Sequence, residues 1–455
     1  MMRLSDAARA IDARLVGVDA RFAGVSTDSR ALGRGELFVA LRGERFDGHA
    51  FLEQARSAGA AGALIDARFA GPAPLPALVV EDTRRALGAL ARHWRARFSP
   101  VLIGIAGSNG KTTTKEMLAA ILVRHAGEAQ VLATLGNLNN DIGLPLTILR
   151  LRETHRYGAI ELGMNRKGEI AYLADIARPT VAVITNAQRE HLEFLGSVEG
   201  AAAENAAVFA ALPREGIAVI NADDAQASYF RQAAGGRRVV DFGLEARAAV
   251  SGGYALRPLS SEIRVRTPAG EASATLAIPG LHNVRNALAA AASAHAAGIG
   301  PRAIGEGLAA FRPYAGRHQV KSLPDGATLI DDSYNANPDS VRAAIDVLAA
   351  AGGRTLLVLG DMGEVGAEGP RFHAEVGHYA RERGVAALYG LGEATREAVA
   401  AFGPGARHFD SAEALAEATR AATRAGVTLL VKGSRFMRME RVVGALTGER
   451  PQGGH

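Results

Sequence analysis

The residues best suited to chemistry in this sequence are a glycine-rich run followed by Lys and Thr. It reads AGSNGKTTTKEM over residues 106–117 and follows the apolar stretch VLIGIAG. A strand, a glycine turn and a helix in this order point backbone N–H groups at phosphate oxygens, and the helix N-terminus favours negative charge. The Lys is expected to reach the β- and γ-phosphates, and the first Thr hydroxyl to bind Mg²⁺. We therefore predict a nucleoside triphosphate site formed by Gly107, Ser108, Asn109, Gly110, Lys111, Thr112 and Thr113.

This loop departs from the strict G-x-x-x-x-G-K-S/T pattern, because Ile105 occupies the first glycine position. An incidental glycine turn would explain the glycines but not the Gly-Lys-Thr-Thr that follows a buried strand. A phosphate loop alone leaves kinases, ATPases and ligases all open. Other residues must decide between these classes.

Alternating strands and helices are expected to position the loop. Apolar runs at 157–161, 181–185 and 217–221 read as buried strands separated by helical stretches. That alternation predicts a mostly parallel sheet with right-handed crossovers. Around 260–278 the alternation shortens and β-formers dominate, which predicts an antiparallel appendage.

Two further units are expected on either side of this sheet. Residues up to about 76 mix short apolar runs with glycine turns, which suggests a small α/β unit, and residues 81–98 have helical spacing with Glu81 and Asp82 near the start. After 312 a third alternating set reads as a doubly wound, Rossmann-like domain, with strands at 328–331, 355–359, 386–389 and 428–431. We therefore predict an α/β protein of three domains, at 1–80, 81–312 (with a connecting helix at 81–98) and 313–455.

Composition excludes several classes of protein. The 455 residues are 48% hydrophobic and 22% charged, which is typical of a compact multidomain chain. A net charge of +5 without a run of like charges favours a generally basic surface over a nucleic-acid site. Absence of cysteine excludes a disulfide framework and a thiolate metal site. Because no signal peptide or long apolar stretch is visible, we expect a cytoplasmic protein without membrane insertion.

Further motifs recur in an order that resembles the Mur ligase family. After the phosphate loop come TLGNLNNDIGLPLT (134–147), IELGMNRKGEI (160–170), TNAQREHLEFLGS (185–197), PGLHNVRNALAAAA (279–292), GRHQ (316–319), DDSYNANPDS (331–340), LGDMGEVG (359–366) and KGSRFMRMERVV (432–443). The likeness covers nearly the whole chain. It implies an ATP- and Mg²⁺-dependent amide-forming ligase, with an N-terminal domain for a UDP-linked substrate, a central ATP-binding domain and a C-terminal ligase domain.

Within the family, the combination of GNLNN, DSYNANP and KGSR resembles the branch that adds D-alanyl-D-alanine to a UDP-N-acetylmuramoyl tripeptide in peptidoglycan synthesis. The D-N-P-R and Tyr-Ala-His-Thr-Pro strings typical of the branch that adds the third residue are absent from the sequence. The resemblance thus implies these two substrates as partners, and we expect a monomer.

The resemblance also implies roles for polar residues around the nucleotide. Glu161 and His191 follow buried strands and would join Thr112 as Mg²⁺ ligands, although either one alone also reads as a strand-end polar residue. The family places Asn283 and Asn286, three apart on one helix face, against adenine, and helix packing is the competing reading for Asn286. The remaining nucleotide contacts implied are Arg317 on the γ-phosphate, Asp332 on ribose, and Asn335 and Asn337, where Asn337-Pro338 also reads as a simple turn.

The substrate contacts are implied in the same way. In the first domain, Thr27, Ser29 and Arg30 offer the hydroxyl and guanidinium donors that a pyrophosphate or uracil needs, and a polar turn is the alternative reading. The other residues that the resemblance assigns to the peptide substrates are Asn137, Asn139, Asn140, Tyr334, Lys432, Ser434 and Arg435.

One position departs from the family. Many members carry a carbamylated lysine about fourteen residues after the metal histidine, where it helps to hold a second Mg²⁺. This chain has Asn205 there, which cannot form a carbamate. Our hypothesis from the sequence is that Glu204 supplies the missing anion.

Two rival readings remain at this point. The chain is also compatible with the preceding tripeptide synthetase or with a folate or cyanophycin type relative, which differ in the amine that stimulates phosphate release. From another class, a regulatory module that hydrolyses ATP without ligation would need the whole row of substrate motifs to be incidental.

Overall fold

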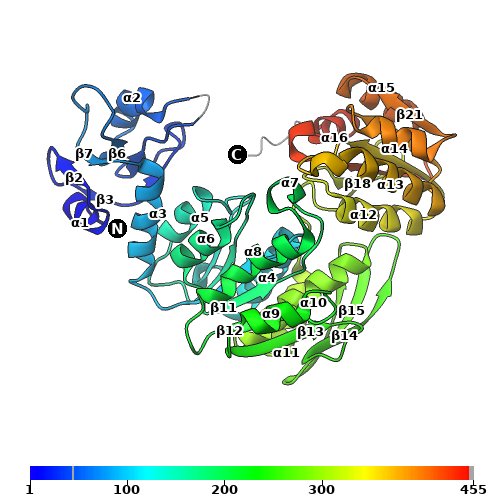
Figure 1. Ribbon diagram of the computed structural model, residues 1–455, viewed down its shortest axis with the longest axis horizontal. Coiled ribbons are helices and arrows are strands. Elements are labelled where there is room, and N and C mark those ends of the chain that lie inside the picture. The colour runs from blue at the N-terminus through cyan, green and yellow to red at the C-terminus, as the bar shows by residue number, and fades with distance from the viewer. Residues whose placement is uncertain (44–45, 450–455) are drawn as a thin grey trace.

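Three α/β units on separate sheets make up the computed structural model, which describes residues 1–43 and 46–449. Figure 1 shows the units following one another along an arc, with the N-terminal and C-terminal units at its two ends. The three sheets have five, nine and six strands, and most of their neighbouring strands run parallel. This architecture confirms the predicted fold class. The end of the third predicted domain, residues 450–455, lies outside the described residues.

The N-terminal unit is a five-stranded sheet in the order β2-β7-β6-β5-β4, in which only the β2–β7 pair is antiparallel. A short antiparallel ribbon of β1 and β3 lies beside it. Its elements are β1 (Met2–Arg3), α1 (Leu4–Ala10), β2 (Arg14–Val16), β3 (Arg21–Phe22), β4 (Val25–Ser26), β5 (Leu37–Val39), η1 (Gly48–Phe51), α2 (Leu52–Ser57), β6 (Gly62–Asp66) and β7 (Ala77–Val80).

Helix α3 (Thr83–Arg95) joins this unit to the central one, which confirms the helix expected there. The Asp82 carboxylate caps its start by accepting hydrogen bonds from two backbone N–H groups, at 2.8 and 3.1 Å. The helix packs on the central unit, and the Trp94 indole N–H donates to the carbonyl of Leu151 at 3.1 Å. The connection is thus packed along its length and not a free linker.

The central unit is a nine-stranded sheet in the order β16-β15-β14-β13-β12-β11-β8-β10-β9. Across the sheet from β9 to β14, β8 included, neighbouring strands run parallel. Strands β14, β15 and β16 form the expected antiparallel appendage. The strands are β8 (Val101–Ala106), β9 (Val131–Ala133), β10 (Tyr157–Glu161), β11 (Val181–Ile184), β12 (Ile217–Asn221), β13 (Arg238–Gly243), β14 (Val250–Leu256), β15 (Ser261–Thr267) and β16 (Gly270–Leu276).

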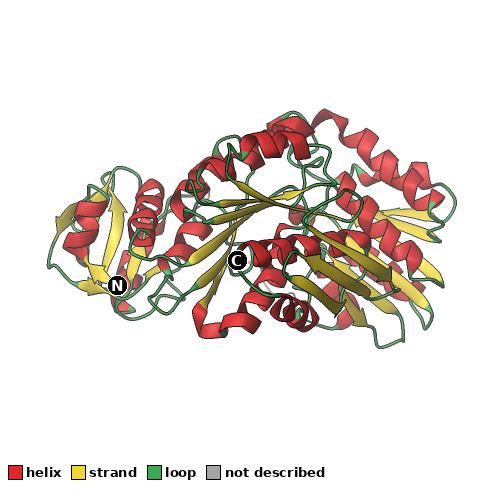
Figure 2. Ribbon diagram, turned by 90° about the horizontal axis from the view of Figure 1, so that it is seen from below, coloured by secondary structure: helices red, strands yellow, loops and turns green. Residues whose placement is uncertain are grey.

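Helices cover both faces of the central sheet, as Figure 2 shows. Along β8, Leu102 and Ala106 belong to one hydrophobic cluster while Ile103 and Ile105 belong to another, which is the two-residue alternation of a strand buried on both faces. The helices are α4 (Lys111–Ala126), α5 (Gly143–Leu149), α6 (Glu169–Ala177), α7 (Leu192–Leu195), α8 (Val198–Ala210), α9 (Ala227–Ala233), α10 (Leu281–Ala296) and α11 (Pro301–Ala310), with η2 at Glu128–Gln130.

The C-terminal unit is a six-stranded sheet in the order β17-β18-β22-β19-β20-β21, with only β17 antiparallel. Its strands are β17 (Gln319–Ser322), β18 (Thr328–Asp332), β19 (Arg354–Gly360), β20 (Ala387–Leu391), β21 (Ala406–Phe409) and β22 (Val427–Lys432). Its helices are α12 (Pro338–Ala350), α13 (Gly369–Glu382), α14 (Thr395–Phe402), α15 (Ala412–Ala422) and α16 (Glu440–Thr447), with η3 (Gly366–Glu368) and η4 (Arg435–Met437). No helix in the described ranges is long and apolar enough to cross a membrane.

Candidate functional site

The phosphate loop lies where β8 ends and α4 begins. Gly107 and Gly110 both have positive φ, at 126° and 83°. A Cβ at Gly107 would collide with Thr185, and one at Gly110 would collide with Asn286. Both glycines are therefore required by backbone conformation and by close packing.

Neighbouring side chains hold the loop in shape. The N–H of Gly107 donates to Asn205 Oδ1 at 2.7 Å, and the N–H of Asn109 donates to Asn186 Oδ1 at 2.9 Å. The first turn of α4 leaves the N–H groups of Lys111, Thr112 and Thr113 without partners inside the helix. These are the donors that the loop presents to an anion.

The Lys111 ammonium is held inward, beside a carboxylate. Its Nζ donates to the carbonyls of Gly107 and Ser108 at 2.6 and 3.0 Å and lies 3.1 Å from Glu190 Oε1. The Lys111 side chain is 12% exposed and that of Glu190 is 10% exposed. Glu190 is not among the residues predicted from the sequence, and its place directly before His191 is the one local signal for it.

Glu161 ends β10 beside the loop. Its Oε1 accepts hydrogen bonds from the Thr112 hydroxyl at 3.1 Å and from the Asn139 amide at 2.8 Å. Its Oε2 is buried and has no hydrogen-bond partner among the described residues. A buried, unpaired carboxylate oxygen is costly, so a cation with oxygen ligands fits this position.

His191 is the N-cap residue directly before α7 and has a positive φ of 49°. Its Nδ1 lies 2.6 Å from Glu364 Oε2, and its Nε2 lies 3.6 Å from Glu190 Oε1. The nearby His191 ring lowers the pKa of Glu364 from its usual value. Within the described ranges no three His, Asp or Glu side chains form a ready-made cation cage. The donor set instead resembles Mg²⁺ sites that use one or two carboxylates and complete the shell with phosphate oxygens and water.

The two asparagines of α10 lie beside the loop. Asn286 donates to Asn283 Oδ1 at 3.2 Å, and Asn283 donates to the carbonyl of Pro279 at 2.7 Å. Both side chains are buried, and Asn286 is the residue that leaves no room for a side chain at Gly110. Asn286 therefore packs against the loop, whatever else it binds.

Arg317 joins the C-terminal unit to the phosphate loop. Its guanidinium lies over the Tyr334 ring, 4.1 Å from the centroid, and its Nη2 donates to the Thr112 hydroxyl at 3.4 Å. Its Nε is buried without a hydrogen-bond partner in the described part of the chain. The guanidinium thus has a free donor at the boundary between the two units.

Asp332 and Lys432 contact each other in this structure. Lys432 Nζ lies 2.5 Å from Asp332 Oδ2 and donates to the carbonyl of Asn335 at 2.8 Å, while His318 Nδ1 lies 3.0 Å from Asp332 Oδ1. Burial works to raise the pKa of Asp332, but His318 and Lys432 hold it well below its usual value. Burial lowers the pKa of Lys432. The Lys432 ammonium and the Asp332 carboxylate therefore neutralise each other, and both are buried from solvent.

Asn337 has a structural contact and a contact across the units. Its Oδ1 accepts from Ser340 N–H at 2.8 Å and caps α12, and its Nδ2 donates to Asn109 Oδ1 at 2.9 Å. The cap agrees with the turn reading of Asn337-Pro338. The bridge to Asn109 brings the start of α12 onto the phosphate loop.

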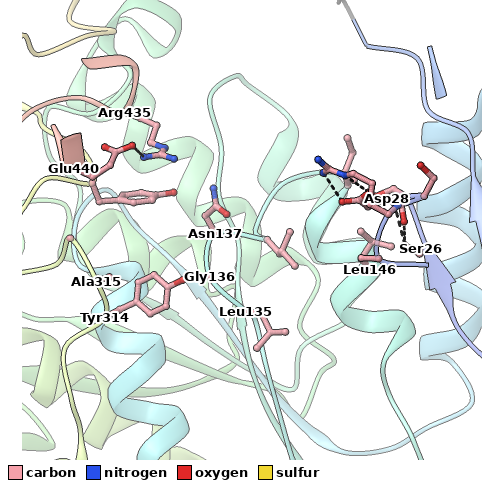
Figure 3. Close-up of a pocket in the computed structure, with 18 of the residues that line it drawn as sticks. Ser26, Asp28, Leu135, Gly136, Asn137, Leu146, Tyr314, Ala315, Arg435 and Glu440 are labelled. Atoms are coloured by element: carbon pink, nitrogen blue, oxygen red, sulfur yellow. Dashed lines mark hydrogen bonds and ion pairs between the residues drawn. The ribbon is translucent and has the colours of Figure 1, made fainter. Parts of the chain in front are cut away.

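A cleft of about 1930 Å³ lies beside these residues, between the N-terminal loop, the central unit and the C-terminal unit. Figure 3 shows Arg435 and Glu440 on one side of it, Asp28 and Ser26 on the other, and Asn137 between them. Six of the predicted substrate residues line it, namely Thr27, Ser29, Arg30, Asn137, Tyr334 and Arg435. Exposed apolar side chains also line the cleft, namely Phe46, Phe51, Leu135 and Tyr314. Of these, Leu135 and Tyr314 were not predicted as site residues from the sequence.

Four predicted substrate residues are engaged elsewhere. Asn139 binds Glu161, and Asn140 Oδ1 accepts from the N–H of Gly143 at the start of α5 at 2.9 Å. Lys432 binds Asp332, and the Ser434 hydroxyl donates to a backbone carbonyl at 3.0 Å. None of the four lines the cleft.

Glu204 also has other partners than the expected cation. Its two carboxylate oxygens accept from the N–H groups of Gly168 and Ile170, both at 2.8 Å, and so cap the start of α6. These contacts give no support to the hypothesis that Glu204 supplies an anion to a metal. The neighbouring Asn205 is the residue that touches the phosphate loop.

Models of the Mur ligase family match most of the chain. The Mur ligase family catalytic domain matches residues 21–95, the Mur ligase middle domain residues 105–294, and the Mur ligase, glutamate ligase domain residues 316–435. The UDP-N-acetylmuramoyl-tripeptide--D-alanyl-D-alanine ligase of Escherichia coli (strain K12) is 41% identical over 447 residues, which cover 97% of this chain and 98% of the relative. The Bacillus subtilis (strain 168) enzyme of the same name is 35% identical over 92% of each chain.

Solved structures give the same likeness. A crystal structure of MurF from Acinetobacter baumannii superposes with a TM-score of 0.90 at 33% identity, covering 98% of this chain and 99% of that one. The MurF ligase of Thermotoga maritima in complex with ADP superposes with a TM-score of 0.81 at 26% identity, covering 94% and 98%.

Proposed function

The chain belongs to the Mur ligase family, and from this premise we propose that it joins D-alanyl-D-alanine to a UDP-N-acetylmuramoyl tripeptide at the expense of ATP, in peptidoglycan precursor synthesis. The relatives that carry this name align with nearly the whole chain. We also propose a cytoplasmic location, because ATP is supplied in that compartment. We further propose that the protein works as a monomer.

The observation that carries the proposal is the position of Arg317. Its guanidinium stacks on Tyr334, which lines the large cleft, and reaches Thr112 on the phosphate loop. A substrate acid in the cleft and a triphosphate on the loop would therefore meet beside one cationic side chain. This arrangement supports a transfer between the two ligands over simple ATP hydrolysis.

In the proposed first step the terminal carboxylate of the tripeptide attacks the γ-phosphorus of ATP. An acyl phosphate forms, and the bond to ADP breaks. Lys111 and Arg317 offset the charge that moves to the phosphate oxygens. When bound, Mg²⁺ would be held by Thr112, Glu161 and His191, and it would supply further neutralisation of the phosphates.

In the second step the amino group of D-alanyl-D-alanine attacks the acyl carbon. The tetrahedral intermediate collapses to the amide and inorganic phosphate, and the ammonium proton is lost. Because water would destroy the acyl phosphate, the units must close over the cleft during the reaction. The nucleotide roles of Asn283, Asn286, Asp332, Asn335 and Asn337 belong to this proposal as well.

An assay of phosphate release that omits each substrate in turn tests the proposal. Release should require ATP, Mg²⁺, the UDP-linked tripeptide and D-alanyl-D-alanine together. Stimulation by another amine would indicate a different ligase, and release without the UDP-linked acceptor would indicate an ATP-hydrolysing module.

The matched variants are Lys111→Ala and Lys167→Ala. Lys167 is an exposed lysine of the same unit, so its loss should leave the rate within twofold of wild type. Loss of Lys111 removes a cation from the transferring phosphate and should lower the rate by about 100-fold or more. A Lys111→Ala protein with the wild-type rate would end the proposal.

A further inference from the structure

The buried carboxylate of Glu190 lies between the Lys111 ammonium and the His191 imidazole. Its Oε1 lies 3.1 Å from Lys111 Nζ and 3.6 Å from His191 Nε2. The side chain is 10% exposed. A carboxylate this close to the phosphate-binding lysine must respond when a triphosphate arrives.

Hydrogen bonds hold the backbone at Glu190 and at the two residues before it. The N–H of Gln188 donates to the Ser108 hydroxyl at 3.0 Å, and the N–H of Glu190 donates to the carbonyl of Gln188 at 2.8 Å. The N–H of Arg189, between these two residues, donates to Asp339 at 2.9 Å. The backbone that carries Glu190 is therefore held beside the loop.

Charge balance at this point changes when nucleotide binds. In this structure Lys111 neutralises Glu190. If Lys111 turns to the β- and γ-phosphates, Glu190 is left as an unpaired, mostly buried anion next to other anions. Such a charge is unfavourable unless a cation replaces the lysine.

The neighbouring imidazole is oriented to share that cation. Glu364 Oε2 lies 2.6 Å from His191 Nδ1, and Nε2 of the same ring lies on the side of Glu190. A carboxylate behind a ligating histidine is the usual way in which proteins orient such a ring. Two neighbouring ligands at about 2.1 Å from one octahedral Mg²⁺ lie about 3.0 Å apart. The Nε2 to Oε1 separation is 3.6 Å without a cation, so the two groups need to approach by only about 0.6 Å to share one.

We propose that Glu190 is a ligand of a divalent cation, which it shares with His191 and with the nucleotide phosphates once Lys111 has moved from Glu190 to those phosphates. The proposal rests on the function proposed above and adds one residue to it. It also replaces Glu204 as the carboxylate of this site, because Glu204 caps α6.

Binding of Mn²⁺, followed by electron paramagnetic resonance with a non-hydrolysable ATP analogue, tests the proposal without turnover. Glu190→Gln keeps the shape and removes the charge, and Glu193→Gln is the matched control because Glu193 is an exposed acid on α7. Glu190→Gln should weaken Mn²⁺ binding at least tenfold, while the control should stay within twofold of wild type. Glu190→Asp, which keeps the charge, should retain more Mn²⁺ affinity than Glu190→Gln.

The opposite result is equally clear. If Glu190→Gln binds Mn²⁺ as wild type does, and binds the analogue more tightly in EDTA, Glu190 is only a counter-ion of Lys111 and the proposal is overturned. If Glu190→Gln does not fold, equal Mn²⁺ affinity of Glu190→Asp and of a Glu190→Asn protein overturns it. Failure of the proposed function would look different, because the wild-type protein itself would then show no phosphate release that depends on the UDP-linked acceptor.

Discussion

Glu204 and Asn205 are neighbours on α8, yet their side chains serve different elements. Glu204 binds two N–H groups at the start of α6, and Asn205 binds the N–H of Gly107 in the phosphate loop. Both side chains are buried. A substitution at either position therefore has a distinct expected effect.

Glu204→Gln should lower stability and leave the Mg²⁺ dependence of the rate unchanged. The variant loses one charged acceptor from the helix cap, and such caps contribute about 1 to 2 kcal/mol. Urea unfolding measures the first effect, and the rate as a function of Mg²⁺ concentration measures the second. A shift of the Mg²⁺ optimum with unchanged stability would restore the earlier hypothesis of a metal-binding Glu204.

His282 predicts a dependence of stability on pH. Burial, with the nearby His318 charge as a second cause, lowers the pKa of His282 to about 3 from 6.5. Between these values the unfolded chain binds more protons than the folded chain, so stability falls as the pH is lowered through that window. The slope from this one group is at most about 1.4 kcal/mol per pH unit.

The measurement is urea unfolding at pH 7, 6 and 5. His282→Gln removes the titration, so the variant should lose less stability over this range than wild type. The carboxylate of Asp332, whose pKa is lowered, adds its own effect only below its usual value of 3.8 and so stays outside the range. Parallel curves for the two proteins would contradict the prediction.

Single residues were predictable from sequence where a contiguous motif fixes them. The loop from Gly107 to Thr112 follows a strand and opens a helix, so its place at the end of β8 follows from local pattern alone. The contact of Glu190 with Lys111 was not predictable, because the two residues lie 79 positions apart in the chain. The pairing of Lys432 with Asp332 was missed for the same reason, since each was read as a ligand contact on its own.

At the scale of elements, the start of α12 combines a helix cap with a bridge to the phosphate loop. Asn337 makes both contacts with one amide, through Oδ1 and Nδ2. Long buried strands such as Ile217–Asn221 were predicted to the residue, because apolar runs bounded by turns define them. The three-residue strand β9 and the edge strand β21 were missed, because they carry too few buried residues to stand out.

Two variants separate the functions of Asn337. Asn337→Ala should cost about 1 kcal/mol of stability through the lost cap, and it should also weaken ATP binding. Asn337→Ser can still cap the helix but cannot reach Asn109, so it should restore most of the stability and leave ATP binding weak. Urea midpoints and nucleotide titrations distinguish these outcomes, and equal ATP affinity in all three proteins would exclude a role for the bridge.

At the scale of the whole molecule, Arg189 ties the central unit to the C-terminal one. Its guanidinium binds Asp339 on α12 and Glu375 on α13 at 2.6 to 3.2 Å and lies over the ring of Phe372. The hydrogen bonds that Arg189 donates to Glu375 and Asp339 raise its pKa, so its guanidinium stays charged at any working pH. Sequence alone gave no sign of this contact, because Arg189 lies in the central unit and both carboxylates lie in the C-terminal unit.

Arg189→Ala should uncouple the unfolding of the two units. A calorimetric transition that is shared in the wild type is expected to split, with the C-terminal unit melting first, because a network between units is removed. Arg302→Ala is the control, since Arg302 is 87% exposed and pairs within its own helix. An unchanged single transition in Arg189→Ala would show that the tie does not couple the units.

The cleft between the units has a thermodynamic consequence of its own. A space of about 1930 Å³ holds on the order of 60 water molecules at roughly 30 Å³ each. Part of its lining is apolar, including Phe46, Phe51 and Leu135. Releasing that hydration when ligand fills the space should give association a large negative heat capacity change. The binding enthalpy should therefore become steadily more favourable between 10 and 30 °C.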